Sequence, residues 1–175
     1  MATTNKPVSA EIEALSAVLG TDASKLLDPM VARAWIALLT AYGRVTRALS
    51  AELMDASGMS LADFDVLAQL VRSEDYRLRM SELADAVLIS KSGLTRRIDR
   101  LAINGWVTRR RCTEDGRVHW ATLTPLGVRT FKAVAPAHLA AVAERFGSAL
   151  PASEMERLTR DLLKIAAKNA EPAQP

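Results

Sequence analysis

MSELADAVLISKSGLTRRIDRLAIN, residues 80–104, is the stretch of sequence that decides the fold. Residues 81–87 predict a compact helix of about two turns, and a three-residue break at 88–90 follows it. Ser90 then caps a longer helix that ends near residue 104, with three apolar residues at helical spacing on its inner side: Leu94, Ile98 and Leu101. A short helix, a tight turn and a longer helix form a helix-turn-helix.

The residues on either side of this stretch add strands. Residues 107–112 and 117–123 are two β-type runs, and the turn between them contains Asp115-Gly116, a hairpin signal. Residues 77–80 alternate polar and apolar side chains and predict a short strand before the helix-turn-helix. The sequence therefore predicts a winged helix-turn-helix: mainly α, with a small β-wing.

Long helices with sustained apolar stripes flank this central part. One begins at Asp28-Pro29 and ends near Ser57-Gly58, and another begins at Thr124-Pro125. The second of these carries Val128, Phe131, Ala135, Leu139 and Val142 along one side. A last helix repeats apolar residues with spacings of three, four and three, at Met155, Leu158, Leu162 and Ile165. Such stripes predict packing against partner helices in a homodimer.

These elements divide the chain into regions. Residues 1–28 form an N-terminal extension with a short helix, and residues 59–123 form the winged helix-turn-helix domain. Residues 29–58 and 124–170 supply the dimerisation helices.

Positive charge is concentrated in the central part. Residues 91–117 contain eight basic and three acidic side chains, a net charge of 8 − 3 = +5, whereas the whole chain carries +3 and the remainder therefore 3 − 5 = −2. A basic region on a slightly acidic body suits phosphate binding, and double-stranded DNA is the expected partner. A solvated charged face is the alternative interpretation.

The candidate DNA contacts lie on the second helix and on the wing. Small hydroxyl side chains beside arginines allow close approach to base edges, and arginine can hold guanine with two hydrogen bonds. An ordinary amphipathic surface helix is the alternative. The predicted contacts are Ser90, Lys91, Ser92, Thr95, Arg96 and Arg100 on the helix, with Arg110, Arg111 and Arg117 on the wing.

The wing carries a spaced motif: Asp115-Gly116-Arg117, five residues, Leu123-Thr124, two residues and Gly127. This motif is similar to the wing signature of the MarR (multiple-antibiotic-resistance) regulators, and the chain resembles that family. The resemblance covers about residues 29–169. It implies an obligate dimer with interleaved N- and C-terminal helices, and a small-molecule effector bound between the dimerisation and DNA-binding regions.

A urate-responsive subgroup of that family also has an extra N-terminal helix. Its ligand residues match Asp65, Arg97 and Arg109, while its stacking tryptophan is absent from the extra helix and Trp35 lies on the next one. The resemblance therefore implies an anionic or phenolic aromatic effector at these four positions. Arg97 borders the interior by helical angle, so an Asp65–Arg97 ion pair that only fixes the helix orientation is the alternative.

Other classes of function fit the composition poorly. The chain has one cysteine, two histidines, no nucleophile motif and no glycine-rich phosphate loop, so we expect no enzyme, no metal and no cofactor. His138 is expected at a helix surface or an interface. No signal sequence and no membrane-length apolar run is present, which predicts a cytoplasmic protein. An architectural DNA-binding protein without effector, or a redox-responsive regulator using Cys112, remains the alternative; Cys112 can also simply pack on its strand.

Overall fold

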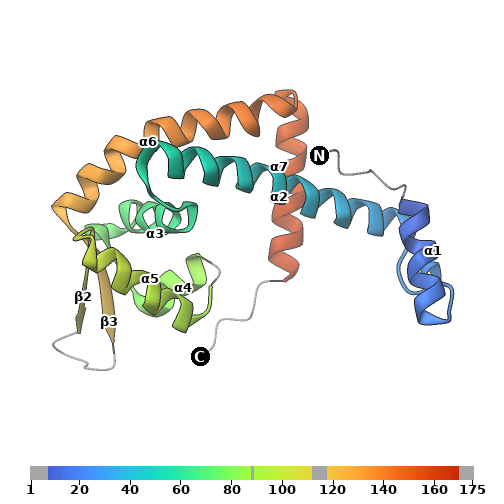
Figure 1. The fold of residues 1–175 in the computed structure, drawn as a ribbon, viewed down its shortest axis with the longest axis horizontal. Coiled ribbons are helices and arrows are strands. Elements are labelled where there is room, and N and C mark those ends of the chain that lie inside the picture. Colours follow the sequence, from blue (N-terminus) through green and yellow to red (C-terminus); the bar gives the residue numbers. More distant parts are fainter. Residues whose placement is uncertain (1–7, 88, 112–117, 170–175) are drawn as a thin grey trace. The chain divides into compact units, whose positions relative to one another are not determined.

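The computed structural model describes residues 8–87, 89–111 and 118–169. The chain forms two compact units, residues 1–47 and 48–175. Helix α2, Pro29–Ser57, runs across the boundary between them (Figure 1). Within the described part of the chain, no helix combines the length and the apolar character that crossing a bilayer requires.

The first unit contains helix α1, Val8–Leu19, the 3-10 turn η1, Ala23–Lys25, and the first part of α2. The Asp28 carboxylate accepts a hydrogen bond from the Met30 N–H at 2.7 Å, so it caps α2 as the Asp-Pro pair predicts. Several large apolar side chains of α2 in this unit are exposed: Val31, Trp35, Leu38, Leu39 and Tyr42.

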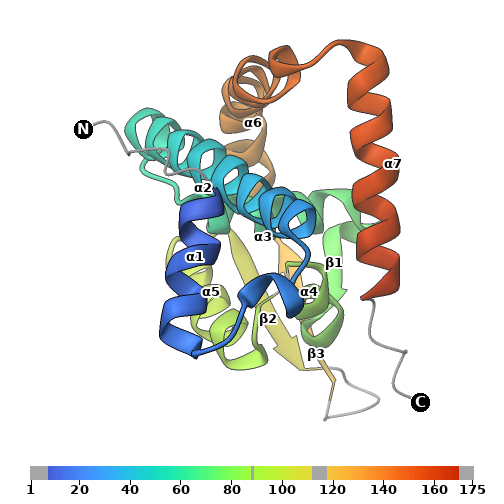
Figure 2. The same ribbon diagram turned by 90° about the vertical axis from the view of Figure 1, so that its right-hand side faces the viewer.

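The second unit contains the winged helix-turn-helix (Figure 1). After the end of α2 come α3, Leu61–Arg72, the 3-10 turn η2, Glu74–Tyr76, strand β1, Arg77–Arg79, α4, Met80–Ala86, and α5, Lys91–Ile103. Strands β2, Val107–Arg111, and β3, His119–Leu123, form the wing. The three strands are antiparallel in the order β1-β3-β2 (Figure 2). The predicted winged helix-turn-helix is confirmed.

The junction between the wing and α6, Pro125–Arg145, explains the Leu-Thr-x-x-Gly pattern. Thr124 Oγ1 donates to the Gly105 carbonyl at 2.7 Å and accepts from the Gly127 N–H at 2.9 Å, so one hydroxyl caps α6 and anchors it to the end of α5. A Cβ on Gly127 would lie 2.1 Å from the Trp106 carbonyl oxygen. Only glycine allows this close approach.

The core of the second unit lies between α3, α4, α5 and the sheet. The inward residues of α5, Leu94, Ile98 and Leu101, have no exposed surface, as the helical spacing predicts. Around them pack buried side chains from every neighbouring element: Leu53, Met59, Phe64, Leu67, Leu70, Leu83, Val107, Ala121 and Leu123. This core fixes α5 and the wing relative to each other.

The chain ends with the 3-10 turn η3, Gly147–Ala149, and α7, Ala152–Lys168. No described residue of α7 is buried, although its apolar residues follow a clear stripe. In α6 the side that faces the core of the same chain includes a polar residue. His138 is buried and its ring centroid lies 4.2 Å from that of Phe64, whereas Leu139 is 62% exposed in the single chain. The buried side of α6 therefore includes Ala135 and His138, and the predicted contact of Leu139 with a partner helix stays a prediction.

Candidate nucleic-acid interface

Helix α5 presents a polar, basic face. Ser90 caps the helix by accepting a hydrogen bond from the Gly93 N–H at 3.1 Å. Ser90, Lys91, Ser92 and Arg96 are exposed or partly exposed, and Thr95 is half-buried with its hydroxyl donating to the Lys91 carbonyl. Because the opposite side of α5 is fully buried, these five side chains have a fixed direction. They form one continuous surface at the N-terminal half of the helix.

The described part of the wing adds three exposed arginines, Arg109, Arg110 and Arg111. Arg110 pairs in register with Trp120, and Arg111 with His119. Neighbouring residues of a strand point to opposite faces, so Arg110 and Arg111 cannot both face the same surface. Three residues of the wing tip that entered the sequence-based expectations, Cys112, Asp115 and Arg117, lie outside the described residues.

The outer face of the sheet carries an aromatic and basic group that sequence reasoning missed. Arg77 and Arg79 place their guanidinium carbons 5.0 and 5.5 Å from the centroid of the Trp120 ring. Arg110 stands opposite Trp120 on the other neighbouring strand. The alternation of residues 77–80 was the available signal, because it placed both arginines on one face of a short strand.

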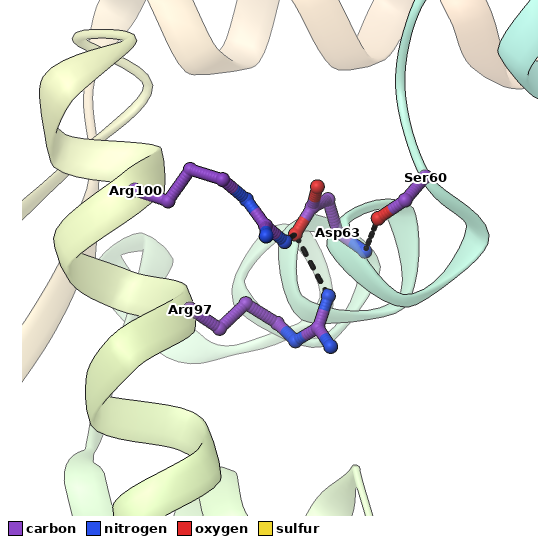
Figure 3. Close-up of polar contacts among 4 residues, drawn as sticks. All are labelled: Ser60, Asp63, Arg97 and Arg100. Atoms are coloured by element: carbon purple, nitrogen blue, oxygen red, sulfur yellow. Dashed lines mark hydrogen bonds and ion pairs between the residues drawn. The ribbon is translucent and has the colours of Figure 1, made fainter.

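The C-terminal half of α5 behaves differently from the sequence-based expectation. Arg97 Nη1 and Arg100 Nη2 both donate to Oδ1 of Asp63, at 2.9 and 2.5 Å (Figure 3). The expected partner of Arg97 was Asp65, which is wrong: the ion pair is with Asp63. Arg100, expected among the DNA contacts, is tied to the same carboxylate while its side chain stays 54% exposed.

Asp63 and Asp65 therefore have opposite electrostatic surroundings. Burial of Asp63 favours its neutral form, but hydrogen bonds from Ser60, Arg100 and Arg97 outweigh that effect, so the pKa of Asp63 is lowered. Partial burial raises the pKa of Asp65, and the charges of His138, Arg97 and Arg72 offset only part of the rise. Asp63 and Asp65 are only two residues apart on α3. The folded chain stabilises the charged form of Asp63 but not that of Asp65.

A sequence signal for Asp63 did exist. Asp63, Leu67 and Leu70 follow the spacing i, i+4, i+7, and all three are buried. A carboxylate on the buried stripe of a helix needs a cationic or hydrogen-bonding partner. Asp65 shares its side of α3 with Arg72, so it points away from that stripe.

Arg97 and Arg109, two of the predicted effector residues in the second unit, have different ion-pair partners. Arg109 lies 4.0 Å from Asp99, whereas Arg97 holds Asp63. Trp35 is 54% exposed in the first unit. Arg109 instead lines a hollow of about 250 Å³ between the starts of α4 and α5 and the wing, with Arg79, Ser81, Lys91, Thr95 and His119.

A second cavity, of about 330 Å³, lies between α6 and the part of α2 in the second unit. Small apolar residues line most of it, and His138 and Glu52 are among its polar members. Glu52 forms an ion pair with Arg145. The expectation that His138 lies at a surface or interface is wrong, because His138 is buried. Burial lowers the pKa of His138, and the negative charge of Asp65 opposes the shift.

The described residues do not provide a cluster of side chains suited to binding a metal ion. Within residues 8–87, 89–111 and 118–169, no group of three or more His, Cys, Asp or Glu side chains is arranged to hold a metal ion.

A buried helical core, a projecting basic helix and an antiparallel wing define a winged helix-turn-helix protein. Comparison with known proteins gives the same result. The sequence model of the MarR family matches residues 57–118. The chain belongs to the MarR family of transcriptional regulators.

Two regulators from Streptomyces coelicolor are similar over nearly their whole length. The structure of AbsC, a MarR family regulator, matches with 33% identity and a TM-score of 0.76, over 81% of this chain and 95% of AbsC. Sco3205, solved in complex with DNA, matches with 30% identity and a TM-score of 0.78, over 85% of this chain and 93% of Sco3205.

A third similar protein is the transcriptional repressor YetL of Bacillus subtilis, 34% identical over 85 residues. That match covers 49% of this chain and about half, 51%, of YetL. These relatives are named as transcriptional regulators, in agreement with the expectation that the chain is not an enzyme.

Proposed function

We propose that this chain is a transcriptional repressor that binds a pseudo-palindromic operator as a homodimer. The observation that carries the proposal is the N-terminal face of α5, with Lys91, Ser92, Thr95 and Arg96 held in fixed directions by the buried core behind them. Such a face fits the major groove, where arginine distinguishes guanine by two hydrogen bonds. The wing arginines Arg110 and Arg111 point to opposite faces of β2, so at least one of them is available for a phosphate contact beside the groove.

The homodimer is proposed because no described residue of α7 is buried in the single chain, and because large apolar residues in the first part of α2 are exposed. Apolar stripes of this length mark contact surfaces in soluble proteins. A two-fold dimer would present two copies of α5, so its operator would be an inverted repeat with half-sites about one helical turn apart. Repression is proposed from the similarity to YetL, which is named a repressor.

The experiment is a comparison of arginine variants on operator DNA taken from the fragments that the parent chain selects. Arg96→Ala is expected to cost about 1–3 kcal/mol on the preferred sequence and to relax preference at one base position. Arg110→Ala is expected to weaken all sequences about equally and to reduce the salt slope by about 0.9 for each phosphate that the variant no longer neutralises.

Arg129→Ala serves as the matched control, because Arg129 is exposed on α6 outside the proposed interface. If Arg96→Ala and Arg110→Ala both bind as tightly and as selectively as the Arg129 variant, α5 and the wing do not read DNA.

We also propose that a small anionic or phenolic aromatic effector releases the DNA. The best-supported position for it is the hollow at Arg109, where Arg79, Lys91 and Arg109 supply positive charge and Thr95 a hydroxyl. Lys91 and Thr95 also belong to the proposed DNA surface, so an anion bound there competes with phosphate for the same groups. Such a ligand shifts the equilibrium only by its difference in affinity between the free and DNA-bound states.

The effector proposal is tested by titrating the operator complex with a panel of aromatic acids and purines. An active compound is expected to lose potency at least tenfold with Arg109→Ala and to keep it with Arg129→Ala. Equal potency against both variants would place the effector away from this hollow.

A further inference from the structure

One carboxylate holds two of the four cationic side chains of α5. The helix carries Lys91, Arg96, Arg97 and Arg100, and the last two both donate to Asp63 Oδ1 (Figure 3). The Asp63 side chain is 9% exposed, whereas those of Arg97 and Arg100 are 23% and 54% exposed. The buried Asp63 carboxylate is therefore the fixed partner, and the more exposed arginine side chains extend to it.

The position of Asp63 in the fold keeps its carboxylate in place, so the ion pairs with Arg97 and Arg100 have a rigid partner. Asp63 lies in the first turn of α3, where its N–H donates to the Ser60 hydroxyl at 3.1 Å. Its neighbours along the buried stripe, Leu67 and Leu70, belong to the fully buried core. An anion at a helix N-terminus is further stabilised by the helix dipole. The Asp63 carboxylate, which accepts both ion pairs from α5, is therefore held in place by α3 and the core. It cannot move together with the two arginines.

We infer that Asp63 is a specificity-determining positioning residue: it keeps Arg97 and Arg100 away from DNA phosphates and sets the rotation of α5 about its axis. This inference rests on the proposed function. The reason is the division of DNA affinity into two parts, a sequence-independent part from cations on phosphates and a sequence-dependent part from base edges. Guanidinium groups of α5 that contact only phosphates raise the first part without raising the second.

Geometry makes Arg100 the critical case. Arg100 is one helical turn beyond Arg96, so the two side chains leave α5 on neighbouring rows. Arg96 is exposed, and more than half of the Arg100 side chain is exposed as well. Without the Asp63 carboxylate, Arg100 is free to extend from α5 beside Arg96, and Arg97 loses its ion-pair partner.

The experiment measures the affinity of Asp63→Asn for the selected operator and for random-sequence DNA across a series of salt concentrations. We expect at least tenfold weaker binding to the operator and unchanged or tighter binding to random DNA, so the ratio of the two affinities falls. The salt slope on random DNA is expected to steepen by about 0.9 for each arginine that newly binds a phosphate.

Two variants serve as controls. Asp55→Asn makes the same charge change at an exposed position of α2 outside the helix-turn-helix, so it corrects for the change in net charge. Asp63→Glu keeps a carboxylate and is expected to recover most of the affinity ratio. Thermal unfolding of each variant verifies that the fold is retained.

If Asp63→Asn does not fold, Arg100→Gln gives the answer instead. Because Arg100 is held on Asp63, this variant is expected to leave the salt slope on the operator unchanged. A slope reduced by about 0.9 per subunit would show that Arg100 binds phosphate and would overturn the inference.

The outcomes separate the inference from the proposed function. If the parent chain binds operator and random DNA equally, the proposed function fails and the inference fails with it. If the parent discriminates and folded Asp63→Asn discriminates as well as Asp55→Asn, only the inference fails, and the Asp63 cluster merely joins two helices.

Discussion

The winged helix-turn-helix and the last helix of the chain bury their apolar residues to very different extents. Leu94, Ile98 and Leu101 of α5 have no exposed surface, whereas α7 has no buried residue among those described. Both helices have a regular apolar stripe, so the difference does not come from local sequence. The first stripe faces a core supplied by the same chain, and the second does not.

This contrast indicates what each region requires in order to be stable. The winged helix-turn-helix contains its own buried core, with α3, α4, the sheet and α6 around α5. Helix α7 gains little from the residues of its own chain, because helical stability in proteins comes mainly from packing an amphipathic face. In the proposed homodimer, a second copy of the chain supplies the missing surface.

The largest expected effect follows from placing a charge in the α7 stripe. Leu162→Glu puts a carboxylate on the face that both copies of a dimer would bury, and an uncompensated buried charge costs about 3–5 kcal/mol. Each dimer carries the change twice. We expect dissociation to monomers at micromolar concentration, measured by sedimentation equilibrium, with operator binding weakened in parallel.

Ala167→Glu is the control, because it introduces the same charge on the opposite side of α7. A parent chain that sediments as a monomer with its helices intact would contradict the proposed homodimer.

Truncating one leucine in α5 and one in α7 compares how much each helix contributes to the free energy of unfolding. Leu101→Ala removes a fully buried side chain from the core and is expected to lower the free energy of unfolding by about 2–5 kcal/mol. Leu163→Ala in α7 truncates a side chain that is 63% exposed and is expected to change it by less than about 0.5 kcal/mol. Urea unfolding of both variants gives the two values, and equal losses would show that Leu163 is buried in solution.

Part of the molecule was predictable because the relevant physics is local. Helical spacing identified Leu94, Ile98 and Leu101 as the buried side of α5, and the Asp-Gly pair indicated the hairpin whose flanking strands the structure contains. The Thr124 cap and the close approach at Gly127 act within a few residues of one another, so the sequence pattern carried them as well.

The partner of Arg97 was not predictable in the same way. Asp63 and Asp65 are both in α3, and which of them meets α5 depends on how the two helices pack. Matching the chain to a subgroup pattern favoured Asp65, whereas the buried stripe of α3 favoured Asp63. His138 followed the same logic, since it occupies the buried side of α6 against Phe64. In both cases a polar residue stood at an apolar position of a helix.

The smallest expected effect concerns these two aspartates and acid. The pKa of Asp63 is lowered by its hydrogen bonds, so its contribution to stability is fully present above the ordinary aspartate pKa, 3.8, and is lost as the pH falls through the lower value in the folded chain. The pKa of Asp65 is raised by burial, so its contribution is present below 3.8 and is lost as the pH rises through the higher folded value.

Urea midpoints measured at pH 7 and near pH 3 test this pair. Asp63→Asn is expected to be less stable than the parent at pH 7, with a difference that shrinks at pH 3. Asp65→Asn is expected to be as stable as the parent or slightly more stable at pH 7. The opposite ranking of the two variants at pH 7 would assign the stabilising ion pair to Asp65.

The central claim, that α5 and the wing of a symmetric dimer read a specific DNA sequence, is tested most directly by selecting DNA from a random pool with the parent chain and sequencing what it retains. We expect enrichment of an inverted repeat whose half-sites lie about 10–10.5 base pairs apart, and loss of the preference at one position of each half-site with Arg96→Ala. Retained DNA no different from the starting pool, or an enriched site that Arg96→Ala selects unchanged, would contradict it.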